Sequence, residues 1–340
     1  MAVINIFNIP KKTTVNVSMQ AKSFIICGKS KAGKSTLCTS APKPIFLMTE
    51  NGTEGLAGFT PLPIGSWADF KQAVSQLCMP QARELYETVV IDSYTNLILL
   101  LDKYIGQKMT TEKNSFDFGS DVDYGKGTKA LQTELGFQLQ RLANQGYILL
   151  NIVHAEDKVD FETQKAYIGV SSISKSLYGV AEKFVDQIVY LRREKPDKVT
   201  GISEHRIWFN AKGGFVGAGG RWTPKVDSVY CSYKNFEEVM LKTIEEDAKE
   251  KNAEIVHEDK PAVAIIQDSF DFTALKSEFD TLTKQLVEES RDNAVKIKEI
   301  CEKELGVGRK VSSLGAGQAE LLSIILNNIK IHFNQNNNLQ

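Results

Sequence analysis

Short apolar runs alternate with amphipathic segments through the first two thirds of the chain. The runs are rich in Ile, Val, Leu and Phe, as expected for strands that are buried on both faces. They occupy residues 23–28, 44–50, 88–93, 147–155, 186–193 and 205–211. Segments with helical spacing, such as 66–78 and 128–146, separate several of them. This alternation predicts an α/β domain whose sheet is largely parallel and flanked by helices, with the last two runs as an antiparallel addition.

The pattern changes after residue 244, where the predicted core ends. Residues 245–264 are charged and poor in large apolar side chains, which indicates a linker. Beyond it, apolar residues recur three and four positions apart, as in an amphipathic helix, at Phe272, Leu275, Phe279, Leu282 and Leu286. Two further helices are predicted after this one. Residues 265–333 are therefore expected to form a small helical unit, followed by a disordered tail at 334–340.

Charge and composition narrow the classes of function. The net charge is −1, but residues from Glu245 onward hold 12 basic against 18 acidic side chains, which leaves 29 against 24 before them. The N-terminal part can therefore face a polyanion, whereas the C-terminal part cannot do so without help. Five scattered cysteines without a C-x-x-C pair favour buried, reduced thiols. Without a signal peptide or an apolar run long enough to span a bilayer, the chain is expected to be cytoplasmic, with no membrane partner.

One segment has a specific chemical signature. Residues 28–35, GKSKAGKS, fit the phosphate-loop pattern G-x-x-x-x-G-K-[S/T]. In such a loop, backbone N–H groups surround the β-phosphate of ATP, and Gly28 and Gly33 permit the tight path. Lys34 bridges the β- and γ-phosphates, and Ser35 ligates Mg²⁺. The predicted nucleotide contacts are Gly28, Lys29, Ser30, Lys31, Ala32, Gly33, Lys34, Ser35 and Thr36.

Three polar residues that follow other apolar runs complete the candidate site. Asp92 ends the run VVID, where an acidic residue beside the phosphate loop can hold the Mg²⁺ through water. Glu50 follows the run PIFLM, and a carboxylate there can deprotonate a water that attacks the γ-phosphate, with Glu54 as a competitor. His154 follows a further run, where it can sense the γ-phosphate. The candidate catalytic residues are therefore Lys34, Glu50 and His154.

The additional lysines of the loop raise a separate question. Lys29 matches the second lysine of partitioning ATPases of the ParA/MinD kind, but Ser30 and Lys31 replace two glycines of their loop. Those ATPases also place an aspartate where this chain has Glu50. Lys29 and Lys31 are therefore expected to line the mouth of the loop.

The order of these elements resembles the RecA-type ATPase core. Its signature is the glutamate in FLMTE followed by VVIDS. RecA has a glutamine at the position of His154. A histidine there is similar to the pattern of a shortened RecA-like group encoded by bacteriophages. Three other strings of this chain also resemble that group: DYGKGTKAL, VDQIVYLRRE and LGVGRKVSSLGAGQAELL. The resemblance covers residues 20–230 well and 265–330 loosely. It implies an ATPase that binds single-stranded DNA and supports phage recombination, annealing or replication in the host cytoplasm.

The resemblance also implies partners and DNA contacts. RecA-like proteins form homo-oligomeric rings or filaments, and a single-strand-binding protein or another recombination partner is expected. Two of their loops reach DNA, and these match residues 106–129, where Phe116, Phe118 and Tyr124 interleave with lysines, and residues 156–179. The first segment also contains four acidic residues, so a surface loop or an oligomer contact is an equally good interpretation of it. The candidate DNA-binding residues are Lys108, Lys113, Lys126, Lys129, Lys158, Lys165 and Lys175.

RecA-type sites lie between subunits, so a cation from a neighbour is expected to complete the pocket. Lys212 and Arg221 flank the glycine-rich GGFVGAGG and are the candidates, with Arg206 as an outsider and a plain β-turn as the alternative. Two other functions stay open: a nucleotide-gated loader or motor that acts on a protein partner, and a P-loop kinase for a small molecule. Residues 101–140 contain no arginine for a lid, which counts against the kinase.

Overall fold

The computed structural model describes residues 13–50, 59–159, 164–171, 173–198, 200–257, 272–305, 308, 310–315 and 318–337. The chain divides into two compact units, residues 1–263 and residues 264–340. No helix of the described residues is long and apolar enough to cross a membrane.

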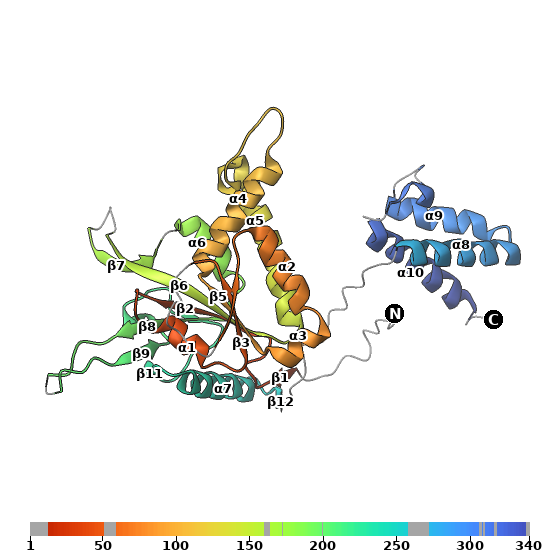
Figure 1. Cartoon of the computed structure of the whole chain (residues 1–340). Helices are drawn as coiled ribbons and strands as arrows, with labels where there is room; N and C mark the ends of the chain where they lie inside the picture. Colours follow the sequence, from red (N-terminus) through yellow and green to blue (C-terminus); the bar gives the residue numbers. More distant parts are fainter. Residues whose placement is uncertain are drawn as a thin grey trace. The chain divides into compact units, whose positions relative to one another are not determined.

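A mostly parallel sheet forms the centre of the first unit (Figure 1). Its parallel strands have the order β8-β2-β6-β5-β3-β4. They are β2 (Ser23–Gly28), β3 (Pro44–Met48), β4 (Thr60–Pro63), β5 (Thr88–Asp92), β6 (Ile148–Val159) and β8 (Gln187–Arg193). The antiparallel strands are β7 (Ala166–Val170), β9 (His205–Trp208), β10 (Gly219–Gly220) and β11 (Ser228–Tyr230). The antiparallel pairing of β8 with β9 confirms that sequence prediction.

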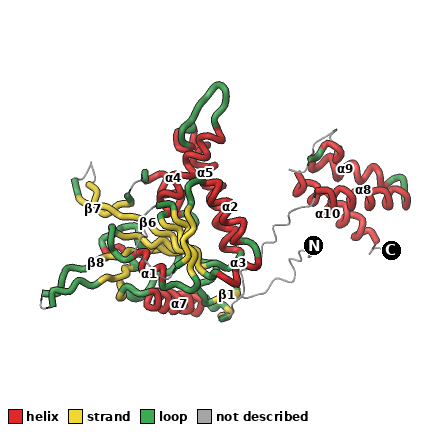
Figure 2. Tube along the Cα trace, in the orientation of Figure 1, coloured by secondary structure: helices red, strands yellow, loops and turns green. Residues whose placement is uncertain are grey.

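Helices cover both faces of this sheet (Figure 2). Alternate residues of β2 point to opposite sides, because Ile25 and Cys27 belong to one apolar cluster and Phe24 and Ile26 to another. The first cluster is completed by α2 (Trp67–Leu77), α4 (Tyr94–Met109), α5 (Lys126–Asn144) and α6 (Lys175–Glu182). The second is completed by α1 (Lys34–Thr39) and α7 (Tyr233–Glu250). A short helix, α3 (Pro80–Leu85), follows α2. The predicted α/β class is confirmed.

Two β-hairpins extend from strands that flank β2 (Figures 1 and 2). The described residues of the β6–β7 arm are 155–159 and 164–170, and those of the β8–β9 arm are 192–198 and 200–206. A third projection joins α4 to α5 through the short 3₁₀ turns η2 (Gly119–Asp121) and η3 (Asp123–Gly125). Asp102 of α4 fastens this projection by accepting hydrogen bonds from the Ser120 backbone N–H (2.7 Å) and hydroxyl (2.8 Å).

The predicted boundary at residue 244 falls inside a helix. α7 continues to Glu250 because Ala248 extends its buried stripe, while its charges lie outside in pairs such as Lys249 with Glu245. The strand β12 (Glu254–Val256) then pairs in parallel with β1 (Thr14–Asn16). The first part of the expected linker therefore belongs to the first unit.

The second unit consists of helices, as predicted for the end of the chain. They are α8 (Phe272–Glu289), α9 (Asn293–Leu305) and α10 (Ala319–Asn337), with the 3₁₀ turn η5 (Val311–Ser313). Their apolar stripes meet in one cluster that includes Phe279, Ile297 and Ile325. The sequence predicts a disordered tail from residue 334, whereas α10 continues to Asn337; residues 338–340 lie outside the described residues.

Candidate nucleotide-binding site

The candidate site lies where the parallel strands end. Gly28, the last residue of β2, is in register with His154 of β6 on one side and with Leu191 of β8 on the other. Met48 of β3 is in register with Asp92 of β5. The carboxyl ends of these strands therefore bring the phosphate loop, the residues after β3, and Asp92 to one edge of the sheet, where α/β proteins bind ligands.

The loop conformation depends on both of its fixed glycines. A Cβ at Gly28 would lie 2.7 Å from the carbonyl oxygen of Leu191, so a larger residue would push against the neighbouring strand. Gly33 precedes α1 with φ 94°, in the left-handed region that favours glycine. A Cβ there would also lie 3.1 Å from Nδ1 of His205, the first residue of β9. The imidazole of His205 therefore rests against the phosphate loop.

We expect Gly33→Ala to destabilise the first unit by about 1–2 kcal/mol, because an L-residue is strained at this φ and must also displace His205. Calorimetric unfolding without nucleotide measures the effect. Gly179→Ala is the matched control, because Gly179 lies in α6 with nothing within 4 Å of an added Cβ. It should raise the free energy of unfolding by about 0.4–1 kcal/mol. Equal midpoints for Gly33→Ala and the unsubstituted chain would contradict this account.

Lys34 is buried at the base of the loop, with 5% of its surface exposed. Its ammonium group donates to the carbonyl oxygens of Gly28 (2.8 Å) and Lys29 (2.9 Å). Burial lowers the pKa of Lys34, while negative charge on Cys27, Asp92 or Glu50 would act in the opposite direction. The lysine that the motif selects is thus held inside the loop, beside two carboxylates.

Ser35 and Asp92 form the candidate metal position. The Ser35 hydroxyl donates to Oδ2 of Asp92 over 2.9 Å. Burial raises the pKa of Asp92, and the hydrogen bond from Ser35 opposes that shift. Within the described residues no three or more His, Cys, Asp or Glu side chains gather to hold a metal by themselves. A hydroxyl and one carboxylate fit Mg²⁺, which is commonly held by one or two protein oxygens together with substrate phosphates.

Glu50 is held from two sides. Oε1 accepts a hydrogen bond from the hydroxyl of Ser93, and Oε2 lies 3.5 Å from Nε2 of His154. The hydrogen bond with the His154 side chain is the largest cause of the lowered pKa of Glu50. The Ser93 hydroxyl also accepts a hydrogen bond from the backbone N–H of Asn96, so Ser93 is the N-cap of α4. Glu50 is therefore an ionised, oriented carboxylate beside the phosphate loop. Its competitor Glu54 lies outside the described residues.

The other loop residues have different surroundings. Lys29 forms an ion pair with Asp157 of the β6–β7 arm, with 2.5 Å between Nζ and Oδ2. Lys31 is exposed, has φ 61°, and forms no ion pair with any described residue. Ser30 and Thr36 are exposed and Ala32 is buried. Lys29 therefore connects the loop to an arm, and Lys31 faces solvent, as expected for the loop mouth.

Most of the candidate DNA-binding lysines lie in helices or strands in the described parts of the two segments predicted as DNA loops. Lys108 lies in the last turn of α4, and Lys126 and Lys129 lie in α5, so Lys113 alone of these lysines stays in irregular chain. In the second segment β6 continues past His154 to Val159 and pairs with β7, so His154 is inside a strand rather than at its end. Lys158 is therefore on the β6–β7 arm, Lys165 precedes β7, and Lys175 begins α6.

The candidates for a role across subunits bind acids of their own chain. Lys212 lies 2.7 Å from Oδ2 of Asp227. Arg221 lies 3.1 Å from Asp186, which precedes β8 and is thus at the sheet edge opposite the phosphate loop. Arg206 lies over the Tyr230 ring. A role for them at a neighbour's site stays a prediction.

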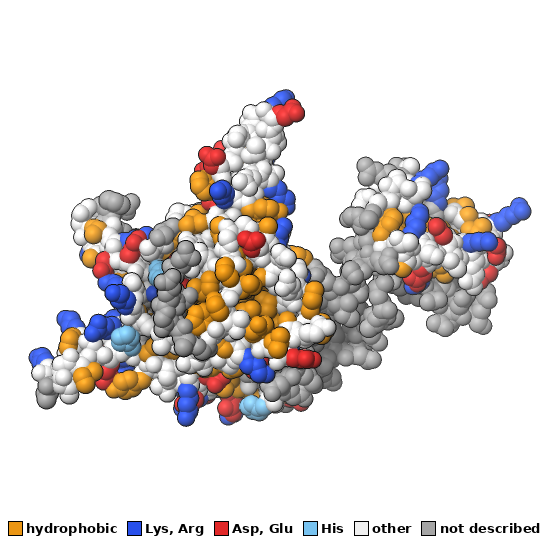
Figure 3. Space-filling model, viewed as in Figure 1, with side chains coloured by type: hydrophobic (Ala, Val, Ile, Leu, Met, Phe, Trp, Pro, Cys, Tyr) orange, Lys and Arg blue, Asp and Glu red, His pale blue; other side chains and the backbone are white. Residues whose placement is uncertain are grey.

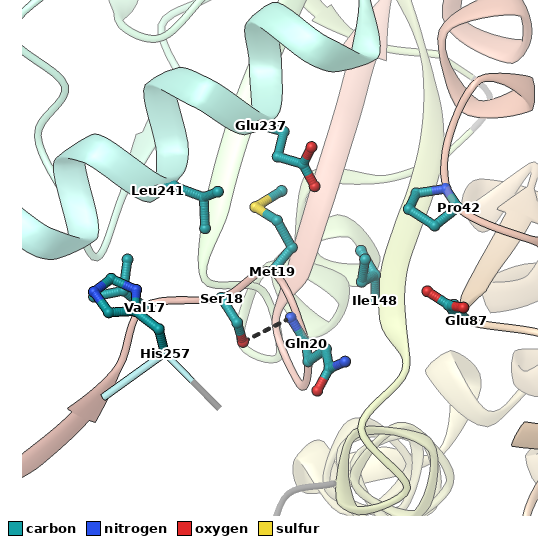
Figure 4. A pocket seen from close by; sticks show the side chains of 10 residues that line it. All are labelled: Val17, Ser18, Met19, Gln20, Pro42, Glu87, Ile148, Glu237, Leu241 and His257. Atoms are coloured by element: carbon teal, nitrogen blue, oxygen red, sulfur yellow. Dashed lines mark hydrogen bonds between the residues drawn. The ribbon is translucent and has the colours of Figure 1, made fainter. Parts of the chain in front are cut away.

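A hollow of about 310 Å³ lies at that opposite edge as well (Figure 4). It is lined by Val17, Ser18, Met19, Gln20, Pro42, Glu87, Ile148, Glu237, Leu241 and His257. Pro42 and Glu87 precede β3 and β5, and Ile148 begins β6, whereas the phosphate loop follows the end of β2. The hollow therefore does not belong to the candidate site.

Sequence reasoning missed three contacts of the site. Ser93 stands in the quoted string VVIDS, so its proximity to Asp92 was visible, but its hydrogen bond to Glu50 was not. The contacts of Asp157 with Lys29 and of His205 with Gly33 join residues that are distant in sequence. No local pattern signals either contact, because both depend on the order of the strands on the two sides of β2.

Known proteins resemble this chain to different extents. The chain is 26% identical over 332 residues to the SPbeta prophage-derived uncharacterized protein YorG of Bacillus subtilis (strain 168). The matched region covers 96% of this chain and 98% of that protein. Among solved structures, the flagellar accessory protein FlaH from Methanocaldococcus jannaschii is 14% identical, covers 62% of this chain and 89% of that chain, and has a TM-score of 0.31. The AAA domain family matches residues 20–219, the segment that contains the phosphate loop, Glu50, Asp92 and His154. The chain belongs to the AAA domain family of P-loop NTPases.

Proposed function

We propose that this P-loop NTPase is a Mg²⁺-dependent ATPase that binds single-stranded DNA and works in phage recombination, annealing or replication. The assembly of Lys34, Ser35, Asp92, Glu50 and His154 at one sheet edge supports the ATPase part. The prophage origin named for the Bacillus subtilis relative supports the phage setting. A homo-oligomer is part of the proposal, because it would let a neighbour's cation reach the site.

Each residue has a role in hydrolysis under this proposal. The phosphate loop and the N-terminus of α1 bind the phosphates of ATP, and Lys34 exchanges its two carbonyl contacts for phosphate oxygens. Ser35, and Asp92 through water, would hold Mg²⁺, which would supply positive charge against the phosphate oxygens. Glu50 takes a proton from the attacking water, because its lowered pKa keeps it ionised. Ser93 and His154 orient that carboxylate.

The β6–β7 arm supports the DNA part of the proposal. In register, Lys158 stands opposite Tyr167, so both side chains share one face of the arm. Tyr167 is 44% exposed, and an aromatic ring beside a lysine suits a base and its phosphate. The same strand contains His154, and Asp157 binds Lys29 of the phosphate loop. Nucleotide binding and DNA binding are thereby joined through β6.

We expect single-stranded oligo(dT) to bind the protein and to stimulate its ATP hydrolysis several-fold in the presence of Mg²⁺. The physical reason is that DNA on the β6–β7 arm would act on β6, and through it on His154 and Glu50. Steady-state turnover with and without oligo(dT) at low salt measures the stimulation. Chelation of Mg²⁺ with EDTA should abolish ATP hydrolysis in both cases. A duplex of the same length is the control.

The opposite results separate the alternatives. If single strands neither bind nor stimulate at low salt while ATP is hydrolysed, the DNA proposal fails and a loader acting on a protein partner becomes the better explanation. If ATP is neither bound nor hydrolysed, the ATPase part of the proposal fails.

A further inference from the structure

The β8–β9 arm has a surplus of positive charge that the site does not use. Arg193, Lys195 and Lys198 are exposed, and none of them forms an ion pair with a described residue. Lysine and arginine side chains are visible along the β8–β9 arm in the space-filling view (Figure 3). Surface cations are common, so the question is whether their charge is balanced locally.

The acids of the arm are already engaged. Glu194 lies 2.7 Å from Arg192 and accepts a hydrogen bond from the indole of Trp208. Glu204 accepts a hydrogen bond from the Tyr230 hydroxyl (2.5 Å). Asp197 accepts from the backbone N–H and the hydroxyl of Thr200 within its own turn. Glu194 and Glu204 thus pair with Arg192 and Arg206, whereas the donors of Thr200 to Asp197 are neutral. Arg193, Lys195 and Lys198 therefore leave the arm with a net positive charge that can attract an external anion.

The position of the arm connects it with the phosphate loop. β8 is the neighbour of β2, and the arm begins one residue after Leu191, which is in register with Gly28. At the other strand of the arm, His205 rests against Gly33. The β6–β7 arm extends from β6 on the opposite side of β2, so the phosphate loop lies between two hairpins. On the β6–β7 arm Lys165 is exposed, whereas Lys158 is half-buried and pairs with Glu156 at 3.3 Å.

We propose that Arg193, Lys195 and Lys198 form a second contact for the backbone of single-stranded nucleic acid, on the opposite side of the phosphate loop from the β6–β7 arm. The proposal rests on the proposed function. The arm holds five basic against three acidic residues, and exposed cations in such a surplus suit a phosphate backbone, which is bound without regard to sequence and with release of counterions. The β8–β9 arm supplies phosphate contacts, while the β6–β7 arm supplies Tyr167 for stacking.

The test is the salt dependence of oligo(dT) binding by the full chain. The variant Arg193→Gln/Lys195→Gln/Lys198→Gln should lower the magnitude of the slope of log Kd against log salt by about 2, because each phosphate contact contributes about 0.7. Its ATP hydrolysis without DNA should equal that of the unsubstituted chain. A matched control removes three exposed charges from α4 and the α7 region, Lys103→Gln/Lys242→Gln/Lys251→Gln, and should leave the slope unchanged.

The outcomes distinguish a DNA contact at the β8–β9 arm from self-association through the arm and from failure of the proposed function. If the unsubstituted chain binds oligo(dT) and the arm variant matches the control, the arm is not a DNA contact although the proposed function survives. If the arm variant binds DNA normally but associates less with itself in sedimentation, the arm binds a second copy instead, and the inference is overturned. If the unsubstituted chain does not bind oligo(dT), the proposed function and the inference fall together.

Discussion

Glu50→Gln is expected to bind ATP with an affinity close to that of the unsubstituted chain and to hydrolyse it slower by a factor on the order of 10²–10⁴. The amide keeps the shape of the side chain and an oxygen that can accept from Ser93, so the surroundings should persist. What it loses is the ability to take a proton from water. Binding of a fluorescent ATP analogue and single-turnover hydrolysis measure the two effects separately.

A carboxylate at the opposite sheet edge provides the control. Glu87→Gln removes the partner of Lys43, at 2.7 Å, far from the phosphate loop, and should leave turnover unchanged. If Glu50→Gln turns over ATP at the normal rate, the general base is another group, and Glu54 is the first to test. If Glu50→Gln also fails to bind ATP, the substitution has disturbed the site, and His154→Gln then tests whether the contact at Oε2 is the cause.

The parts of the fold that the sequence predicted are those with a strong local pattern. The strands that are buried on both faces, such as β2 and β5, have uninterrupted apolar runs. The phosphate loop has fixed glycines at fixed spacing. Since parallel strands end at the same edge, the proximity of Lys34, Asp92 and Glu50 followed from the assignment of three strands alone.

The β6–β7 arm was missed because its strands are not buried on both faces. β6 passes from an apolar run into the polar sequence AEDKV, whose residues are mostly exposed, so hydrophobic alternation ends at the sheet edge while hydrogen-bonded pairing with β7 continues. Hydropathy does not predict this part of the strand, because it is formed by backbone hydrogen bonds and not by burial of side chains. The same cause hid the end of α7, where charged residues such as Lys249 cover the outer face of a helix that is still buried on its inner face.

Lys34→Ala is expected to weaken ATP binding by a factor of about 10–150, because a charged hydrogen-bonding group contributes about 1.5–3 kcal/mol. Hydrolysis should fall further, since charge on the γ-phosphate develops as the reaction proceeds. The fold should survive, because the two carbonyl groups that Lys34 contacts lie in a loop at the sheet edge, where water can replace the ammonium group. The measurement is the shift of the unfolding midpoint on addition of MgATP, which should be smaller in the variant.

Lys31→Ala is the matched control within the same loop. Lys31 is exposed and unpaired among the described residues, and alanine keeps a Cβ at its φ of 61°, so backbone strain is the same in both chains. We expect a midpoint shift with MgATP close to that of the unsubstituted chain. If the two substitutions weaken ATP binding equally, the loop attracts phosphate by its summed charge and Lys34 has no special role. If only Lys34→Ala does, the buried lysine is the one that binds phosphate, and Lys31 lies outside the site.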